Sequence, residues 1–80
     1  MNHPPMLELD VRPLCASGHP PLGAILNSVN KLQEGQALRL IAPFEPKPLY
    51  ELLGKRGFSH VTKPHGDGSF EVIFAPGDPR

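Results

Sequence analysis

The sequence predicts an α/β two-layer sandwich in the order β-α-β-α-β-β, with two helices on one face of a four-stranded mixed sheet. Three of the four expected strand runs alternate apolar and polar residues, which is the period of a strand with one buried face. Two runs between them repeat apolar residues every three or four positions, as amphipathic helices do. Because the strand runs alternate and are not apolar throughout, we expect helices to cover only one face of the sheet.

The first strand is expected over Met6–Val11, where apolar residues at every second position alternate with Glu8 and Asp10. Pro13 cannot donate a backbone hydrogen bond to a sheet and is therefore expected to end the strand. The segment that follows is expected to be the loop that leads into the first helix. This loop contains the only cysteine of the chain, Cys15.

The first helix is expected from Leu22 to about Gln33, after two consecutive prolines that suit a helix start. Gly35 is placed to end it in the left-handed conformation. Leu26 lies in the middle of the apolar stripe, so we expect it to be central to the core and to contact the inward residues of the first two strands. The residues of the stripe are Leu22, Ile25, Leu26, Val29 and Leu32.

The remaining elements follow from the same two periods. A right-handed crossover is expected to place the first two strands parallel. Residues 64–68 contain glycines that supply the positive φ of a hairpin turn, so the last two strands are expected to be antiparallel. These elements are a strand over Ala37–Ala42, a helix from about Pro46 or Pro48 to Arg56, and strands over Phe58–Lys63 and Ser69–Ala75.

The bulk composition restricts the function. The 80 residues are enough for one small domain, which we place at residues 6–75, with flexible tails at residues 1–5 and 76–80. Eight basic residues balance eight acidic ones, which argues against nucleic acid or a membrane as partner. One cysteine cannot form an internal disulfide, and no secretory or membrane-spanning run is visible. The sequence therefore predicts a cytoplasmic protein with a reduced thiol, and it leaves the oligomeric state open.

Several motifs together resemble the TusA/SirA-like superfamily of small sulfur carriers. The resemblance begins with Leu9–Arg12, which is followed by a leucine, the cysteine and a proline-started helix. The segments Glu45–Leu53, Arg56–His60 and Gly66–Phe70 resemble most closely an uncharacterised small-domain branch of that superfamily. The sulfur carriers place their thiol in a Cys-Pro-x-Pro motif at the helix start, and this chain lacks that motif. The resemblance, over roughly residues 6–75, implies a single TusA-like domain.

Cys15 is the main candidate functional residue, and two functions remain open for it. A sulfur-carrier or protein-interaction module would use Cys15 as a persulfide carrier, whose thiolate needs a helix N-terminus or a cation such as Arg12 nearby. Its partner would be a sulfur-transfer or redox protein. The alternative is a small-ligand or metal-binding regulatory domain that uses the loop from Cys15 to His19. Asp10 is expected to hold Arg12 or to accept backbone N–H groups and fix the turn.

No motif of a self-contained enzyme accompanies these residues. The sequence lacks a phosphate-binding loop, a dinucleotide fingerprint, a Ser-His-Asp set and a carboxylate pair, so we expect at most a persulfide carrier and no cofactor. A soft-metal site of Cys15, His19, His60 and His65 would require the hairpin to fold toward the loop, and we assign no metal. Tyr50 on the second helix is expected to be half-buried and amphipathic.

Overall fold

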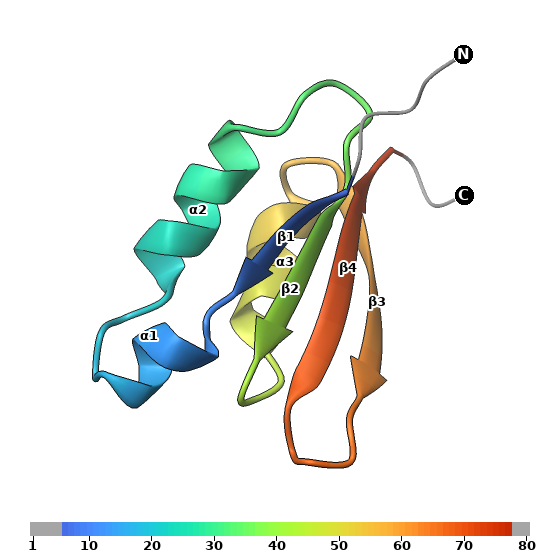
Figure 1. Ribbon diagram of the computed structural model, residues 1–80. Coiled ribbons are helices and arrows are strands. Elements are labelled where there is room, and N and C mark those ends of the chain that lie inside the picture. Colours follow the sequence, from blue (N-terminus) through green and yellow to red (C-terminus); the bar gives the residue numbers. More distant parts are fainter. Residues whose placement is uncertain (1–5, 78–80) are drawn as a thin grey trace.

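The computed structural model describes residues 6–77 and has two layers, a four-stranded mixed sheet and helices on one of its faces (Figure 1). The strand order is β1-β2-β4-β3, so the last strand lies inside the sheet, and β1 and β3 form its edges. The predicted α/β two-layer sandwich is confirmed. The described elements are β1 (Leu7–Asp10), α1 (Arg12–Ala16), α2 (Leu22–Asn30), β2 (Leu38–Ala42), α3 (Lys47–Gly54), β3 (Phe58–Pro64) and β4 (Phe70–Pro76).

The pairing of the strands agrees with the predicted connections. β1 and β2 run parallel, with Leu7 beside Leu38. β4 pairs antiparallel with β2, with Val72 beside Leu40, and it forms an antiparallel hairpin with β3. The parallel pair at the start of the chain and the hairpin at its end are therefore both confirmed.

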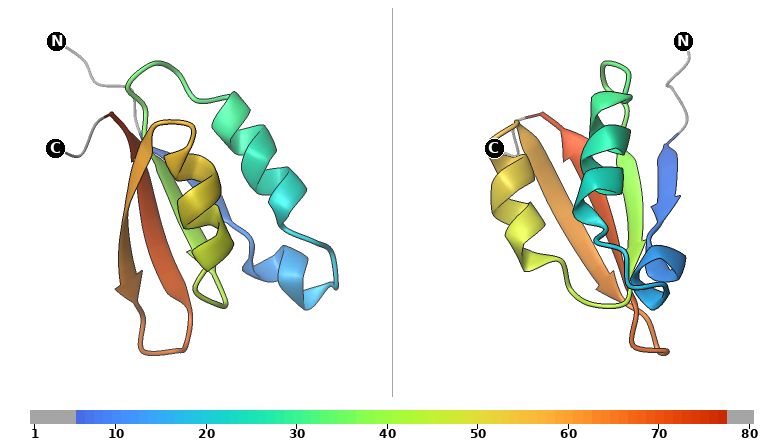
Figure 2. Two further views of the ribbon diagram at one scale, coloured as in Figure 1. Left: turned by 180° about the vertical axis from the view of Figure 1, so that it is seen from behind. Right: turned by 90° about the vertical axis from the view of Figure 1, so that its left-hand side faces the viewer.

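The core lies between the sheet and the two longer helices, α2 and α3 (Figure 2). Leu38, Leu40, Val72 and Phe74 are at most 1% exposed, as the alternation of β2 and β4 predicts. These side chains share one face of the sheet because successive residues of a strand point to opposite sides. The buried hydrophobic residues are Val11, Ile25, Val29, Leu38, Leu40, Ala42, Leu49, Leu53, Val72 and Phe74.

The first long helix, α2, is shorter than predicted, and it is rotated about its axis relative to the predicted orientation. It ends at Asn30, and Gly35, with a φ of 81°, lies in the loop beyond it rather than at its end. Ile25 is buried, whereas Leu26 is only partly buried and packs at the margin of the core. The prediction that Leu26 is central to the core is therefore wrong. Leu26 lies about 100° around the helix from Ile25, and the sheet covers the side on which Ile25 lies.

The segment expected to be a loop contains a short helix, α1, which lies past the carboxyl end of β1 (Figure 1). Pro13 stands in its first turn, where the missing N–H costs nothing. The helix ends in a Schellman motif: Gly18, with a φ of 80°, donates to the Cys15 carbonyl at 3.1 Å, and His19 donates to the Leu14 carbonyl at 2.9 Å. Cys15 is thus a helical residue, and its predicted loop position is wrong.

The second half follows the predicted order with small shifts in its boundaries. α3 ends at Gly54, two residues before the predicted end, because Arg56 donates to the Leu53 carbonyl at 3.0 Å in a tightening turn. Pro76 is the last residue of β4. Residues 1–5 and 78–80 of the predicted tails lie outside the described residues. No helix within residues 6–77 is long and apolar enough to span a membrane.

Candidate functional site

An apolar hollow of about 230 Å³ lies beside the carboxyl ends of the parallel strands β1 and β2. This end of the sheet is where α/β proteins commonly bind their ligands. The walls come from the end of β1, from β2, from the first turns of α2 and α3, and from the loop between β2 and α3. The residues that line the apolar hollow are Val11, Pro21, Leu22, Ile25, Leu40, Ala42, Phe44, Pro46, Pro48 and Leu49.

The floor and the rim of the apolar hollow differ in exposure. Val11 and Leu40 at its floor are fully buried, whereas Leu22 and Phe44 at its rim are 46% and 45% exposed. Every lining residue is apolar, so no side chain there can orient a polar ligand through a hydrogen bond. The apolar hollow is therefore suited to a group that gains from leaving water and needs no polar partner.

Prolines reduce the number of free backbone N–H groups that the start of α3 presents to the apolar hollow. Pro46 and Pro48 have no N–H at the start of α3. Lys47 donates its N–H to the Glu45 carbonyl at 2.9 Å, and Leu49 donates to the Pro46 carbonyl at 3.0 Å. The first turn of α3 thus has no free backbone donor among these residues, and the anion site typical of a helix N-terminus is not formed there.

Cys15 lies outside the apolar hollow, on α1. Its side chain is partly buried and packs against the core, and its N–H donates to the carbonyl of Val11, a residue of the hollow floor, at 2.9 Å. His19 is exposed, and no hydrogen bond or ion pair links it to Cys15 in the described chain. The described residues also contain no group of three or more His, Cys, Asp or Glu side chains arranged to hold a metal. The structure thus places Cys15 one helical turn from a residue of the hollow floor, and no described contact joins its side chain to His19.

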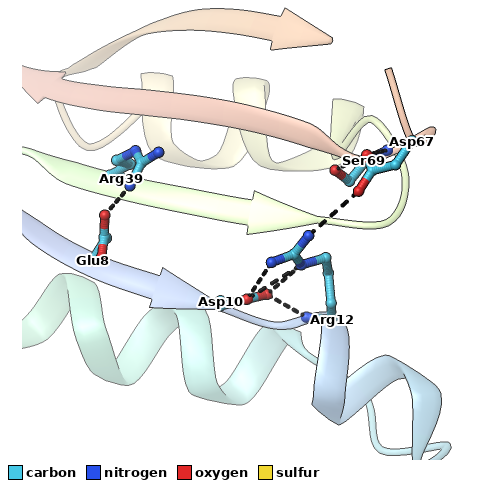
Figure 3. A network of polar contacts seen from close by, with 6 residues as sticks. All are labelled: Glu8, Asp10, Arg12, Arg39, Asp67 and Ser69. Carbon is cyan, nitrogen blue, oxygen red and sulfur yellow. Dashed lines mark hydrogen bonds and ion pairs between the residues drawn. The ribbon is translucent and has the colours of Figure 1, made fainter. Parts of the chain in front are cut away.

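Asp10 and Arg12, the charged residues singled out in the sequence, make both of the expected contacts (Figure 3). Asp10 accepts the Arg12 backbone N–H at 3.0 Å and binds the guanidinium, with Nη2 at 2.8 Å. The side-chain hydrogen bond from Arg12 lowers the pKa of Asp10 below its ordinary value. Arg12 also reaches Asp67 in the β3–β4 turn at 3.7 Å. These contacts fix the step from β1 into α1 and tie it to the hairpin.

A second polar network lies on the uncovered face of the sheet and was not predicted. Arg39 of β2 binds Glu8 of β1 and donates its Nε to Glu71 of β4 at 2.6 Å. His65 Nε2 lies 3.1 Å from the other oxygen of Glu71. The hydrogen bond from Arg39, with that from His65, lowers the pKa of Glu71 to about 2. The sequence signal was present, because Glu8 and Arg39 are polar positions of two strands predicted to be neighbours.

Tyr50 is half-buried, as predicted, and belongs to a contact that the sequence did not indicate. Its ring stacks on His60 of β3 with the centroids 3.8 Å apart and the planes at 2°. The hydroxyl bonds to Glu45 at 3.1 Å and to Thr62. Burial raises the pKa of Tyr50. With its hydroxyl shared between two partners, Tyr50 joins α3 to the edge strand β3.

The comparisons with known proteins identify a family and no individual relative. No curated protein and no solved structure matched the chain. Nothing in the comparisons connects the chain to the TusA/SirA-like superfamily that its motifs resemble. Residues 8–76 match a family described as an uncharacterised conserved protein, DUF2249. That match spans β1 to the end of β4, and the chain therefore belongs to the DUF2249 family of uncharacterised conserved proteins.

Proposed function

We propose that this domain is a protein-interaction module whose apolar hollow receives an apolar side chain of a partner protein. The observation that supports the proposal is the wholly apolar lining together with the half-exposed rim residues Leu22 and Phe44. Sites for small metabolites combine apolar walls with a few placed polar groups. The buried centre of a protein interface is apolar and poor in charged groups, and the wholly apolar hollow matches such a centre better than it matches a metabolite site.

Binding in the hollow is expected to depend on a single anchoring side chain. An aliphatic or aromatic group that fills it would leave water and contact the buried Val11 and Leu40 at its floor. Anchors of this kind supply most of the binding energy in many interfaces. Lys47, which is exposed and stands in the chain between the lining residues Pro46 and Pro48, can offer a polar contact beside the hollow.

Peptide selection tests this function without knowledge of the natural partner. A phage-displayed library selected on the domain should enrich peptides with a fixed apolar residue, and calorimetry should show that Phe44→Glu and Leu22→Glu each weaken their binding about tenfold or more. Met6→Glu is the matched control, since Met6 is 46% exposed and does not line the hollow. Selected peptides that bind the Phe44→Glu variant as tightly as the wild type would exclude the apolar hollow as the binding site.

A sulfur-carrier role of Cys15 is the second candidate, with a sulfur-transfer or redox protein as the partner. The partly buried thiol is one helical turn from Val11 of the hollow floor, so a protein docked there would lie near α1. In the transfer, the Cys15 thiolate attacks the terminal sulfur of a donor persulfide. The sulfur moves to Cys15, and the donor leaves as a thiolate.

Intact-mass measurement separates the carrier function from simple binding. After incubation with a low-molecular-weight persulfide, the wild-type chain should gain the mass of one sulfur atom, and Cys15→Ser should gain none. The gain should disappear on treatment with a thiol reductant. If the wild-type chain gains no sulfur, the carrier role is excluded, and the interaction module stands without it.

A further inference from the structure

The outer edge of β3 has unpaired backbone groups whose positions follow from the hairpin. His65 donates to the Ser69 carbonyl at 2.8 Å, and Gly77 donates to the Gly57 carbonyl at 2.9 Å. In an antiparallel ladder the hydrogen-bonded pairs recur at every second residue. The odd-numbered residues of β3 therefore bond to β4, and the N–H groups of His60 and Thr62 point away from the sheet. No other strand of residues 6–77 pairs with this edge.

The side chains along this edge are also open to a partner. Val61, at the centre of the seven-residue strand, is 58% exposed and lies on the face that no helix covers. On the other face, His60 stacks on Tyr50, and this contact joins β3 to α3. A seven-residue edge strand with an exposed valine at its centre can serve as a template for pairing with another chain.

The opposite edge of the sheet, β1, is a poor template by comparison. β1 has only four residues. Leu7 and Val11 direct their N–H groups to the Ala37 and Ile41 carbonyls, which leaves Glu8 and Asp10 with their N–H groups turned outward. Two β1 edges paired in antiparallel fashion would place these acidic side chains against each other, and like charges across strands are destabilising.

We propose that β3 pairs with β3 of a second copy of this chain, antiparallel and with the two-fold axis at Val61. This register pairs all seven residues of the strand. His60 faces Thr62 of the second copy, and each such pair exchanges both of its backbone hydrogen bonds. Val61 faces its own counterpart at the short side-chain distance of a non-hydrogen-bonded pair. The two four-stranded sheets become one continuous sheet.

The residues at the ends of the strand fit the same register. Pro64 lacks an N–H, but it faces Phe58 of the second copy, whose N–H still donates to the Pro64 carbonyl. Lys63 faces Ser59, so no like charges meet across the axis. The apolar hollow has no residue from β3, and the pair therefore leaves two such hollows free.

Charge exchange at Val61 tests the pairing and its two-fold axis together. Sedimentation equilibrium of the wild-type chain should show a concentration-dependent dimer. Val61→Glu and Val61→Lys should each raise the dissociation constant about tenfold or more, because each places like charges opposite each other. An equal mixture of the two variants should restore the dimer as a heterodimer. Monomeric wild-type chain at the concentrations used for NMR spectroscopy would overturn the proposal, as would a mixture no more dimeric than either variant.

Two substitutions at Thr62 test the backbone hydrogen bonds. Thr62→Pro removes an N–H that points outward and leaves the ladder to β4 intact, so it should also raise the dissociation constant about tenfold or more. Thr62→Val keeps the N–H and should leave dimerisation unchanged. A dimer that tolerates both Thr62→Pro and Val61→Glu but is lost in Phe44→Glu would place the interface at the apolar hollow and overturn the proposal. Val61 is exposed, so its variants give a result even if Thr62→Pro fails to fold.

Discussion

The two faces of the sheet are built on different physical principles. The face under α2 and α3 is closed by aliphatic and aromatic side chains such as Leu40 and Phe74, which are at most 1% exposed. The opposite face is crossed by ion pairs, from Glu8 through Arg39 to Glu71. Burial of apolar area is non-directional and large in sum, whereas exposed ion pairs contribute little each and depend on geometry. We therefore expect the stability of the domain to come mainly from the covered face. The strand register is expected to be supported by contacts on both faces.

The largest effect is expected from Phe74→Ala on the covered face. Phe74 is 1% exposed, and replacing a buried phenylalanine by alanine costs about 3–5 kcal/mol. A domain of this size holds only about 5 kcal/mol or somewhat more, so the variant should be largely unfolded at room temperature. Urea unfolding followed by circular dichroism measures the loss.

The matched control for Phe74→Ala is Val61→Thr on the uncovered face, with both variants measured at concentrations where the chain is monomeric. Val61 is 58% exposed, and threonine keeps the β-branched shape that strands favour. Its cost should stay below about 0.5 kcal/mol. Equal midpoints for the two variants would contradict the assignment of the core to the covered face.

Two adjacent residues of α2 test the same difference between buried and more exposed side chains. Ile25→Ala removes a buried side chain, 3% exposed, and should cost about 2–5 kcal/mol. Leu26→Ala removes a partly buried one and should cost about 1–2 kcal/mol. Thermal melts of the two variants measure the order directly. The reverse order would restore Leu26 to the centre of the core and would show that α2 is rotated from its described orientation.

The strands were predictable because alternation along a strand reports directly on the two faces of a sheet. Leu38 and Leu40 on one side and Arg39 on the other gave the orientation of β2 before any tertiary contact was known. The rotation of α2 about its axis was less predictable, because its apolar stripe is wider than the part of the helix that the sheet covers. The stripe identified the helix, and the position of the sheet selected Ile25 over Leu26.

The site was less predictable than the fold. A helix of five residues is too short for a periodic signal, and Pro13 in its first turn is equally typical of the end of a strand. The apolar hollow could not be predicted, because its walls come from segments that meet only through the parallel pairing of β1 with β2. The resemblance to sulfur carriers indicates Cys15 and carries no information about the hollow.

α1 belongs to neither face, and its position depends on its ends. Gly18 has a φ of 80°, and an alanine in that conformation costs about 1–2 kcal/mol. Gly18→Ala should lower the free energy of unfolding by that amount and change the amide resonances of α1. Gly23→Ala is the opposite control: Gly23 is helical, with nothing within 4 Å of an added Cβ. It should leave stability unchanged or raise it by up to about 1 kcal/mol. If both substitutions stabilise, the left-handed end of α1 is wrong.

The smallest effect on the free energy of unfolding is expected on the uncovered face. There, the difference between a variant and the wild type should depend on pH. The folded-state pKa of Glu71 is lowered from 4.5 to about 2, chiefly by the hydrogen bond from Arg39. A lowered pKa stabilises the folded state above the unfolded value, and this contribution is lost as the pH falls from about 4.5 toward 2. Glu71→Gln should therefore be less stable than the wild type at neutral pH, and the difference in stability should shrink over that interval.

Urea unfolding midpoints at a series of pH values measure this difference for Glu71→Gln. Glu34→Gln is the control, since Glu34 is exposed and makes no ion pair within the described chain. A difference that stays constant from neutral pH to pH 2 would mean that the charge of Glu71 does not stabilise this face.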